Sequence, residues 1–447
     1  MQARREEIPM ASYSDVLLRL KELVSEAESQ LRQSPCALAD DLIKISEEIR
    51  SLSGDSHESP VDIHLVPSTS GHSTDVALQG SMKLERRRGS NKPHRELDFG
   101  KYKKRHVVLE IMYIGVRFQG FAKQDSTDNT IEAELFKALL KTRLIPSDED
   151  IASKIQYSRC GRTDRGVSAL GQVVALLLRS NGRTGKPQVS ECEEMEYDRI
   201  LNSALPPEIR VLGWTTAPSD FNARFSARYR QYKYFIVSHD TGDSKSTFEI
   251  DRMREAARHF IGEHDFRNFC KPDVLAVRSF QRSIMSFDIE KTDIDDPTCG
   301  AHVFALNIRG TAFLWHQVRC MAAVLLLVGR GLEEPCIVSQ MLDLATTPSK
   351  PQYPMAAEEP LLLYACGFQG LTFRRSGRAL ETSLSTLQGV LDHHLVAAAR
   401  TSVIMERIRK DCPKISSFPK TAEERHIKLA KRHREPSVEE RMKKWVG

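Results

Sequence analysis

The sequence predicts an α+β protein whose body consists of two similar halves, with helical extensions at both ends. Three observations support this class: strand-like and helix-like segments alternate in the first half, the same mixture begins again after residue 219, and both ends show helical periodicity. The expected parts are a helical arm (1–51), a disordered linker with a basic run (52–100), two half-domains (101–218 and 219–375) and a basic helical tail (376–447).

The composition describes a globular chain in which no membrane or secretion signal is visible. Of its 447 residues, 40% are hydrophobic and 28% are charged. The longest near-continuous apolar run, residues 320–328, is far shorter than the ~20 residues that a membrane-spanning helix needs. The first ten residues contain no apolar signal core. We therefore expect an intracellular protein, in the nucleus, the cytoplasm or the mitochondrion.

The cysteines indicate reduced thiols. There are nine, an odd number, and no two of them form a C-x-x-C pair. Such scattered positions fit neither a disulfide framework nor the ligand spacing of a zinc site. We expect no metal site on these grounds.

The positive charge is concentrated in two segments, although the net charge is only +5. Residues 81–105 carry ten Lys and Arg against three acidic residues, and residues 401–447 carry thirteen against seven. Basic segments beside a near-neutral body suggest a polyanionic partner, most simply nucleic acid. A solvated tail, or a nuclear-import signal around residues 86–88, is the alternative for either segment.

The first half begins with a strand over residues 106–114 and a glycine-bearing turn over 115–124. Asn129, with Glu132 three residues later, predicts the capped start of a helix over 131–143. The other expected elements lie at residues 196–204 (helix), 209–215 (strand), 251–261 (helix), 280–289 and 303–309 (strands), 315–328 and 335–344 (helices) and 361–368 (strand). In the tail, Thr421 and Ser437 begin a weak repeat that predicts basic helices facing RNA or solvent rather than the core.

Residues 157–176, YSRCGRTDRGVSALGQVVAL, predict a strand, a polar turn from Gly161 to Gly166, and a second strand. Asp164 in this turn is flanked by Arg162 and Arg165. Because nearby positive charge favours the ionised carboxylate, this residue is a candidate anion for catalysis. The alternative is a surface turn in which Asp164 bonds only its own backbone.

Residues 221–234 interleave cations with aromatic residues. The cations are Arg224, Arg228, Arg230 and Lys233, and the aromatic residues include Phe225, Tyr229, Tyr232 and Tyr234. Aromatic rings that stack on bases, set among cations that hold phosphates, are typical of a nucleic-acid surface. The alternative is a strand whose aromatic residues are core and whose arginines are solvated.

Arg319 begins an apolar helix in HQVRCMAAVLLLVG. A partly buried arginine needs a partner, and a carboxylate such as Asp164 is an attractive one. Arg319 could instead reach solvent or bond backbone carbonyls. His316 fits a polar residue at a helix start better than a metal ligand, because no other His or Cys lies at ligand spacing.

The motifs GRTDRGV, NARFSARYRQYKY and AFLWHQVRCM, in this order, closely resemble the tRNA pseudouridine synthase A family. KRHVVLEIMYIGVRFQGFAKQ and NTIEAELFKALLKTRL are similar to its eukaryotic branch, which modifies the anticodon stem-loop at positions 38 and 39. The resemblance covers roughly residues 101–370 and does not cover residues 1–80 or most of the last 75. It implies the pseudouridine synthase fold, with a central, largely antiparallel sheet.

The resemblance also implies the reaction and the roles of its residues. Asp164 matches the nucleophile of uridine isomerisation, Arg319 the arginine that pairs with it, and Tyr232 the aromatic that packs on the target base. Arg162 matches the arginine associated with base flipping, while Arg165, Arg224 and Arg228 are expected to contact the RNA. No metal or redox cofactor is implied.

Two residues depart from the family pattern. Arg165 stands where related sequences tend to have Lys or Ala, and Trp315 stands where a tyrosine is often found. Neither change affects the expected nucleophile. The resemblance implies a homodimer that acts on tRNA. A catalytically silent tRNA-binding or chaperone protein of the same fold is the alternative, although this chain retains Asp164, Tyr232 and Arg319.

Overall fold

The computed structural model describes residues 97–147, 154–218, 220–239, 247–274, 277–296, 300–412 and 426–446. All of them belong to one of two units of the chain, residues 92–447. The expected helical arm, nearly all of the linker and the Thr421 copy of the tail repeat lie outside the described residues.

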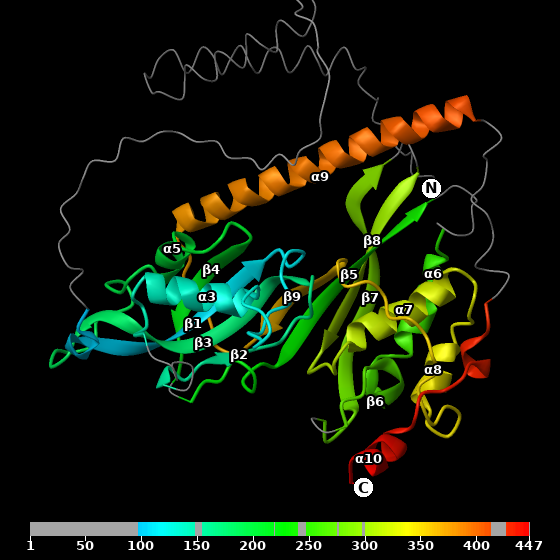
Figure 1. Ribbon diagram of the computed structural model, residues 1–447, viewed down its shortest axis with the longest axis horizontal. Helices are drawn as coiled ribbons and strands as arrows, with labels where there is room; N and C mark the ends of the chain where they lie inside the picture. Colours follow the sequence, from blue (N-terminus) through cyan, green and yellow to red (C-terminus); the bar gives the residue numbers. More distant parts are fainter. Residues whose placement is uncertain are drawn as a thin grey trace, which may run out of the picture. The chain divides into compact units, whose positions relative to one another are not determined.

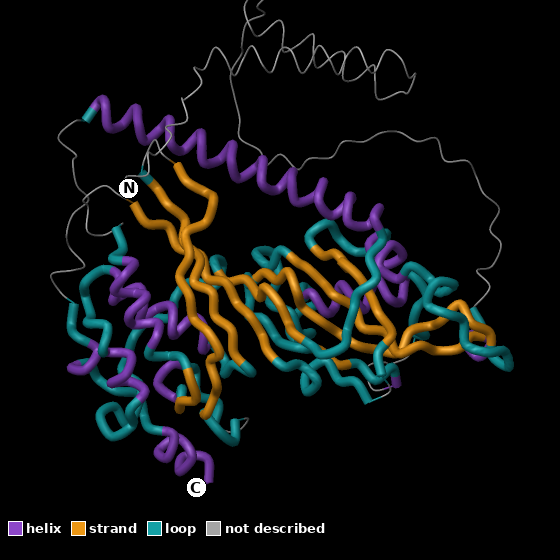
Figure 2. The backbone as a smooth tube through the Cα atoms, turned by 180° about the vertical axis from the view of Figure 1, so that it is seen from behind, coloured by secondary structure: helices purple, strands orange, loops and turns teal. Residues whose placement is uncertain are grey.

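A nine-stranded mixed sheet runs through the described residues (Figures 1 and 2). Its strands are β1 (Tyr102–Tyr113), β2 (Ser158–Arg159), β3 (Ser168–Arg183), β4 (Ile209–Thr216), β5 (Tyr229–His239), β6 (Gly262–Asp265), β7 (Gln281–Asp296), β8 (Ala301–Gly310) and β9 (Leu361–Gly367). The strand order is β4-β1-β3-β9-β5-β8-β7-β6, and β2 pairs with β3. The β3–β9 pair is parallel and the other strand pairs of the sheet are antiparallel. The predicted α+β class with a largely antiparallel sheet is confirmed.

The helices lie close to where periodicity predicts them. They are α3 (Ile131–Lys141), α5 (Tyr197–Asn202), α6 (Ile250–Arg258), α7 (Gln317–Gly329), α8 (Ile337–Leu342), α9 (Gly377–Asp411) and α10 (Val438–Val446), with short 3-10 turns η1 (Phe99–Lys101), η2 (Arg267–Phe269) and η3 (Leu429–Lys431). None of the helices in the described part of the chain is long and apolar enough to cross a membrane.

The first half of the sheet packs on α3 and α5. Val107, Val108 and Leu109 of β1 are all fully buried, so this strand is covered on both faces. Side chains that face α3 join one hydrophobic cluster with Leu135 and Leu139. A central strand of this kind has a continuous apolar sequence rather than strict alternation.

The second half of the sheet packs on α6, α7 and α8, which Figure 2 shows grouped beside β5–β8. Helix α7 is buried along most of its length, including Cys320, Met321 and Leu325. The apolar run that the sequence shows here is therefore a core helix. Tyr232 of β5 touches the hydrophobic clusters of both halves.

The predicted cap of α3 is wrong by one residue. Thr130 is the N-cap, and its Oγ1 accepts a hydrogen bond from Ala133 N over 3.2 Å. Asn129 instead donates its side-chain amide to Arg117 O over 2.8 Å, and Glu132 accepts from Lys123 N over 2.8 Å. Both side chains thus fasten the preceding turn rather than the helix end.

The two described parts of the tail, α9 and residues 426–446, pack against different halves of the body. The start of α9 packs against the first half, where Ser376 N donates to Asp198 Oδ2 over 2.7 Å, and the rest of α9 is largely exposed (Figure 1). Residues 426–446 return to the second half, and Leu429 is fully buried in its core. The expectation that this part of the tail faces RNA or solvent rather than the core is therefore wrong at Leu429. A hydrogen bond from the Leu429 backbone N–H to Glu333 over 2.7 Å holds this residue in place.

Candidate active site

Asp164 lies in the loop between β2 and β3, hereafter the Asp164 loop (residues 160–167). Gln172 of β3, a fully buried side chain, closes this loop. Its Nε2 donates to Gly161 O over 3.0 Å, and its Oε1 accepts from Gly161 N over 3.2 Å. The amide therefore satisfies both polar groups of the Gly161 backbone where the chain leaves the sheet.

The turn at residues 115–121 gives the Asp164 loop a second support. Phe121 N donates to Thr163 O over 3.1 Å, and the Thr163 hydroxyl lies 2.7 Å from Tyr113 OH. Gly120 has a φ of +107°, and a Cβ there would lie 3.0 Å from Thr163 O. Only glycine accepts this backbone angle at so close an approach.

Ring nitrogens of two side chains meet the Asp164 carboxylate. Trp315 Nε1 donates to Oδ1 over 3.2 Å, and His316 Nε2 lies 3.4 Å from Oδ2. The Asp164 side chain is 27% exposed, so it is held but still open to a substrate. Within the described residues neither Arg162 nor Arg165 forms an ion pair with Asp164, and both are exposed. The sequence-based idea that these two guanidiniums hold the carboxylate is thus not supported by the geometry.

Residues 311–316, hereafter the Trp315 segment, connect β8 to α7. His316 adopts the left-handed region, with φ 61°, at the N-cap of α7. This conformation is uncommon for a residue other than glycine and often marks a functional site. Lys271 Nζ lies 4.4 Å from the centroid of the Trp315 ring. Burial lowers the pKa of His316 and outweighs Asp164, which raises it. The lowered pKa favours a neutral imidazole at neutral pH.

The structure does not pair Arg319 with Asp164. Arg319 Nη2 donates to Glu358 Oε2 over 2.8 Å, and its Nε donates to Ala356 O over 2.8 Å. The predicted direct pair is therefore wrong. Arg319 lies one turn along α7 from His316, and its guanidinium donates its hydrogen bonds to the chain before β9. Its charge still reaches the site: after burial, which is the largest cause, Arg319 also lowers the pKa of His316, while Asp164 raises it.

Tyr232 lies on β5 at the junction of the two halves. Its ring packs edge-to-face on Phe313 of the Trp315 segment, with the ring centroids 5.1 Å apart. Burial raises the pKa of Tyr232 far above its usual range, so the phenol stays protonated. A packed aromatic ring in this place can support a base.

Residues 221–228, which directly precede β5, form a turn, hereafter the Arg224 loop. Asn222 Oδ1 accepts the backbone N–H groups of Arg224 and Phe225 over 3.0 and 3.3 Å. The Arg224 and Phe225 side chains are exposed, and the Phe225 residue is 79% exposed. A large apolar side chain held out on a fixed backbone is suited to stack on a base.

The predicted site residues are thus only partly brought together. Asp164 meets the segment that precedes Arg319, and Tyr232 packs on the same segment through Phe313. Arg228 is exposed and donates to Gln369 Oε1. The role of Gln172 in closing the Asp164 loop was not predicted. The available signal was a polar residue directly before the apolar residues VVAL (173–176).

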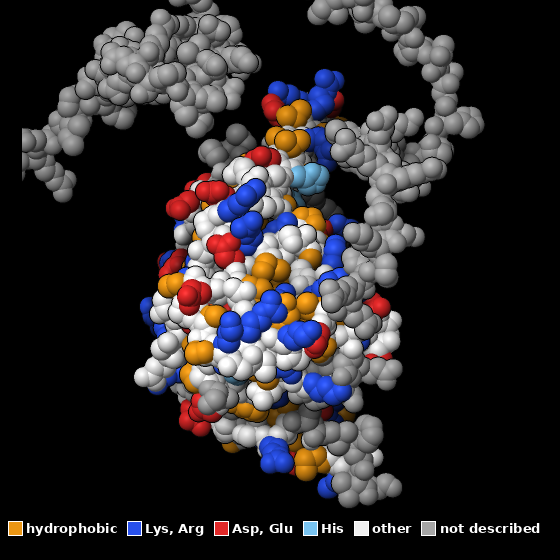
Figure 3. Space-filling model, turned by 90° about the vertical axis from the view of Figure 1, so that its left-hand side faces the viewer, with side chains coloured by type: hydrophobic (Ala, Val, Ile, Leu, Met, Phe, Trp, Pro, Cys, Tyr) orange, Lys and Arg blue, Asp and Glu red, His pale blue; other side chains and the backbone are white. Residues whose placement is uncertain are grey.

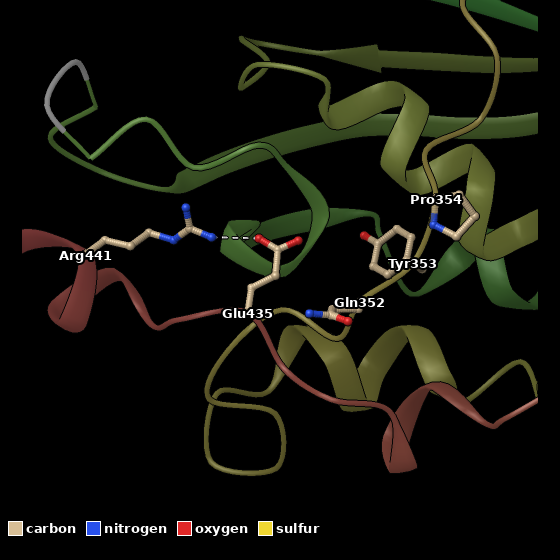
Figure 4. A pocket seen from close by; sticks show the side chains of 5 residues that line it. All are labelled: Gln352, Tyr353, Pro354, Glu435 and Arg441. Atoms are coloured by element: carbon tan, nitrogen blue, oxygen red, sulfur yellow. Dashed lines mark hydrogen bonds and ion pairs between the residues drawn. The ribbon is translucent and has the colours of Figure 1, made fainter.

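A separate cavity of about 500 Å³ lies between the C-terminal segment and the chain that follows α8 (Figure 4). Its lining residues are Gln352, Tyr353, Pro354, Glu435 and Arg441. Arg441 Nη2 donates to Glu435 Oε2 over 2.7 Å, so the two charges in this cavity neutralise each other. None of the predicted site residues lines it. In the described residues, no cluster of His, Cys, Asp and Glu could hold a metal ion.

Known proteins resemble this chain over most of its described length. The family model of tRNA pseudouridine synthase matches residues 256–369. The tRNA pseudouridine(38/39) synthase of Homo sapiens is 42% identical over 323 residues, 69% of this chain and 65% of that protein. The protein of the same name from Saccharomyces cerevisiae is 36% identical, over 69% of each chain. The tRNA pseudouridine synthase A of Methanothrix thermoacetophila is 32% identical, over 68% of this chain and 97% of its own length.

The matched part of the chain spans slightly less than two thirds of the human protein and almost all of the Methanothrix one. The family match begins after the Asp164 loop and includes the Trp315 segment and Arg319. Identities above 30% over two thirds or more of the relatives' length indicate common descent. The chain therefore belongs to the tRNA pseudouridine synthase family.

Proposed function

We propose that this chain isomerises uridine to pseudouridine in tRNA, at positions 38 and 39 of the anticodon stem-loop. The observation that carries the proposal is the Asp164 carboxylate, met by Trp315 and His316 on a loop fastened to the sheet. Family membership supports the reaction class. The names of the human and yeast relatives support the two positions.

Asp164 acts as the nucleophile toward the target nucleoside. A carboxylate oxygen bonds the sugar carbon as the bond from that carbon to the uracil nitrogen breaks. The uracil turns, and a ring carbon bonds the sugar carbon as the carboxylate leaves. That ring carbon loses its proton and the freed nitrogen gains one, so the reaction is an isomerisation without net loss of atoms. The hydrogen bond from Trp315 orients the anion before attack, so that little reorganisation is needed. Tyr232, packed on Phe313, supports the base.

The target uridine has to leave its stack, because the attacked atoms cannot be reached inside a stem. Arg162 is the residue for base flipping, and the exposed Arg165, Arg224 and Arg228 contact phosphates. Figure 3 shows Lys and Arg side chains spread across the middle of one face, with apolar side chains between them. Arg319 supplies positive potential near the carboxylate without a direct ion pair.

A homodimer in the nucleus or cytoplasm completes the proposal. The outer part of α9 exposes Leu384, Leu391, Leu395 and Ile408, an apolar surface that a second copy of this chain could cover. The seven described cysteines are free thiols, in keeping with a reducing intracellular compartment.

The proposal is tested on transcribed tRNAs that carry uridine at position 38, at position 39, at both or at neither. We expect purified protein to form pseudouridine at each of the two positions and none in the tRNA that has cytidine at both. Mass spectrometry and chemical mapping measure the product. Tight binding of all four tRNAs without any pseudouridine would support the catalytically silent alternative instead.

Trp315→Phe is expected to slow pseudouridine formation about 10-fold, because the hydrogen bond from the indole N–H to Asp164 is lost. A hydrogen bond to a charged group contributes about 1.5–3 kcal/mol. The lower end of this range applies here, because the Trp315 side chain is half-exposed. The matched variant is Trp315→Tyr, which keeps an O–H donor and should lose less. Single-turnover rates measure both. Equal rates for the two variants would show that the donor at residue 315 does not orient Asp164.

A further inference from the structure

The Arg230 guanidinium joins three separate segments around the candidate active site. Its Nη2 donates to Cys160 O, at the start of the Asp164 loop, over 3.1 Å and to Arg224 O, in the Arg224 loop, over 2.6 Å. Its Nη1 donates to Thr311 O, at the start of the Trp315 segment, over 2.8 Å. One side chain of β5 therefore contacts the backbone of the Asp164 loop, the Arg224 loop and the Trp315 segment.

The position of Arg230 in the sheet makes it a rigid anchor. Its backbone is paired with Gly310 of β8 on one side and with Cys366 of β9 on the other. The guanidinium is planar and presents its N–H groups in a fixed fork, so its three acceptors are held at set directions. A lysine ammonium at the same place is a single point donor and cannot reproduce this geometry.

The contacts of Arg230 indicate a structural role, different from the RNA contact that its place among the cations of residues 221–234 suggests. Its three acceptors are neutral carbonyl oxygens, and within the described residues no carboxylate forms an ion pair with it. Hydrogen bonds from a charged donor are stronger than those between neutral groups. The terminal nitrogens of this cation are therefore engaged by the protein, unlike those of the exposed Arg224.

We propose that Arg230 is a positioning residue that sets the spacing of the Asp164 loop, the Arg224 loop and the Trp315 segment. The expected effect of Arg230 on the reaction rate rests on the proposed function. Its expected effect on the spacing of the segments rests on the three carbonyl contacts. Asp164 and its donor Trp315 come from two of the three segments, so a shift between them misaligns the nucleophile. A misplacement of 1 Å can slow a reaction about 100-fold.

The test compares Arg230→Lys with Arg254→Lys in the full-length protein. Arg254 also bonds a backbone carbonyl, Ile289 O, over 3.2 Å from Nε and 3.0 Å from Nη2, but lies on α6 outside the candidate site. We expect Arg230→Lys to lower the single-turnover rate about 10- to 100-fold, with tRNA affinity within a few-fold of the wild type. Arg254→Lys should keep the wild-type rate. A rate within twofold of the wild type for Arg230→Lys would overturn the proposal.

Hydrogen exchange provides a readout that needs no activity. In Arg230→Lys, amides of the Asp164 loop, the Arg224 loop and the Trp315 segment should all exchange faster, while those of α6 keep their protection. Faster exchange throughout the chain, or unchanged exchange in all three segments, would contradict a positioning role. If wild-type protein made no pseudouridine, the proposed function would fail, and the exchange result would still decide whether Arg230 joins these segments.

Discussion

Asp164→Asn is expected to abolish pseudouridine formation while leaving the fold and the affinity for tRNA nearly unchanged. Asparagine has the shape of aspartate and keeps an oxygen for the Trp315 indole N–H, so the loop should hold its place. It lacks the negative charge and nucleophilic oxygen that the reaction requires. Loss of a nucleophile lowers rates on the order of 10⁴- to 10⁶-fold in enzymes where it has been measured.

The measurement is single-turnover conversion of a tRNA with uridine at positions 38 and 39, with binding followed separately by filter retention. Asp125→Asn, an exposed carboxylate outside the site, is the matched control and should retain wild-type turnover. Turnover of Asp164→Asn at the wild-type rate would assign the nucleophile to another residue. Loss of both turnover and binding would instead indicate that the Asp164 loop had lost its structure.

The Asp164 loop could be predicted because its determinants are local in sequence. Two glycines, a polar turn and apolar strands on both sides specify a loop at the end of a strand pair, and the structure has β2 and β3 there. The closing contacts are different in kind. Thr163 meets Tyr113 and Phe121, residues that lie in β1 and in the turn after it, and no local pattern records such a pairing.

The partners of Asp164 and Arg319 could not be predicted for the same reason. Charge, the expected burial of Arg319 and the family resemblance all suggested that the carboxylate and the guanidinium meet. The left-handed backbone of His316 places Trp315 and His316 against Asp164, while Arg319 meets Glu358. A residue in this conformation changes the direction of the chain, and nothing in the letters around it signals that turn.

The C-terminal segment shows how composition can mislead. A net positive tail suggested surface helices, yet Glu333, itself buried, accepts the Leu429 N–H and lies 2.8 Å from His426 Nε2. One buried apolar side chain and one buried carboxylate help to fix this stretch on the body, together with backbone hydrogen bonds between residues 350–352 and 433–435. Average charge does not reveal which few residues of a basic segment make such contacts.

Arg105→Met is expected to lower the free energy of unfolding by about 3–5 kcal/mol, because it leaves the Glu194 carboxylate buried without its cation. The two side chains are 7% and 0% exposed, and Arg105 Nε donates to Glu194 Oε2 over 2.8 Å. Native domains have stabilities of only about 5–15 kcal/mol, so such a loss is large. Urea and thermal denaturation measure it.

An exposed pair on α5 provides the control. Arg199 lies 3.2 Å from Glu196, and these side chains are 61% and 56% exposed. Arg199→Met should therefore cost less than about 1 kcal/mol. If the two variants lost similar, small amounts of stability, the Arg105–Glu194 pair would not be holding β1 to the loop before α5.

The pH dependence separates a charge effect from simple loss of packing. Burial raises the pKa of Glu194, but hydrogen bonds from Ser180, from the Asn181 and Met195 backbone N–H groups and from Arg105 together outweigh it and lower the pKa. A carboxyl whose pKa is lower in the folded state stabilises the protein above the unfolded pKa, near 4.3, and this stability is lost as the pH falls through the folded value. Removing Arg105 raises the folded pKa, so the variant should differ most from the wild type at neutral pH. The difference in unfolding free energy should shrink below about pH 4, where Glu194 in the variant is protonated and no longer a buried charge. A difference that stays constant from pH 7 to pH 3 would mean that Arg105 stabilises the protein through its packing alone.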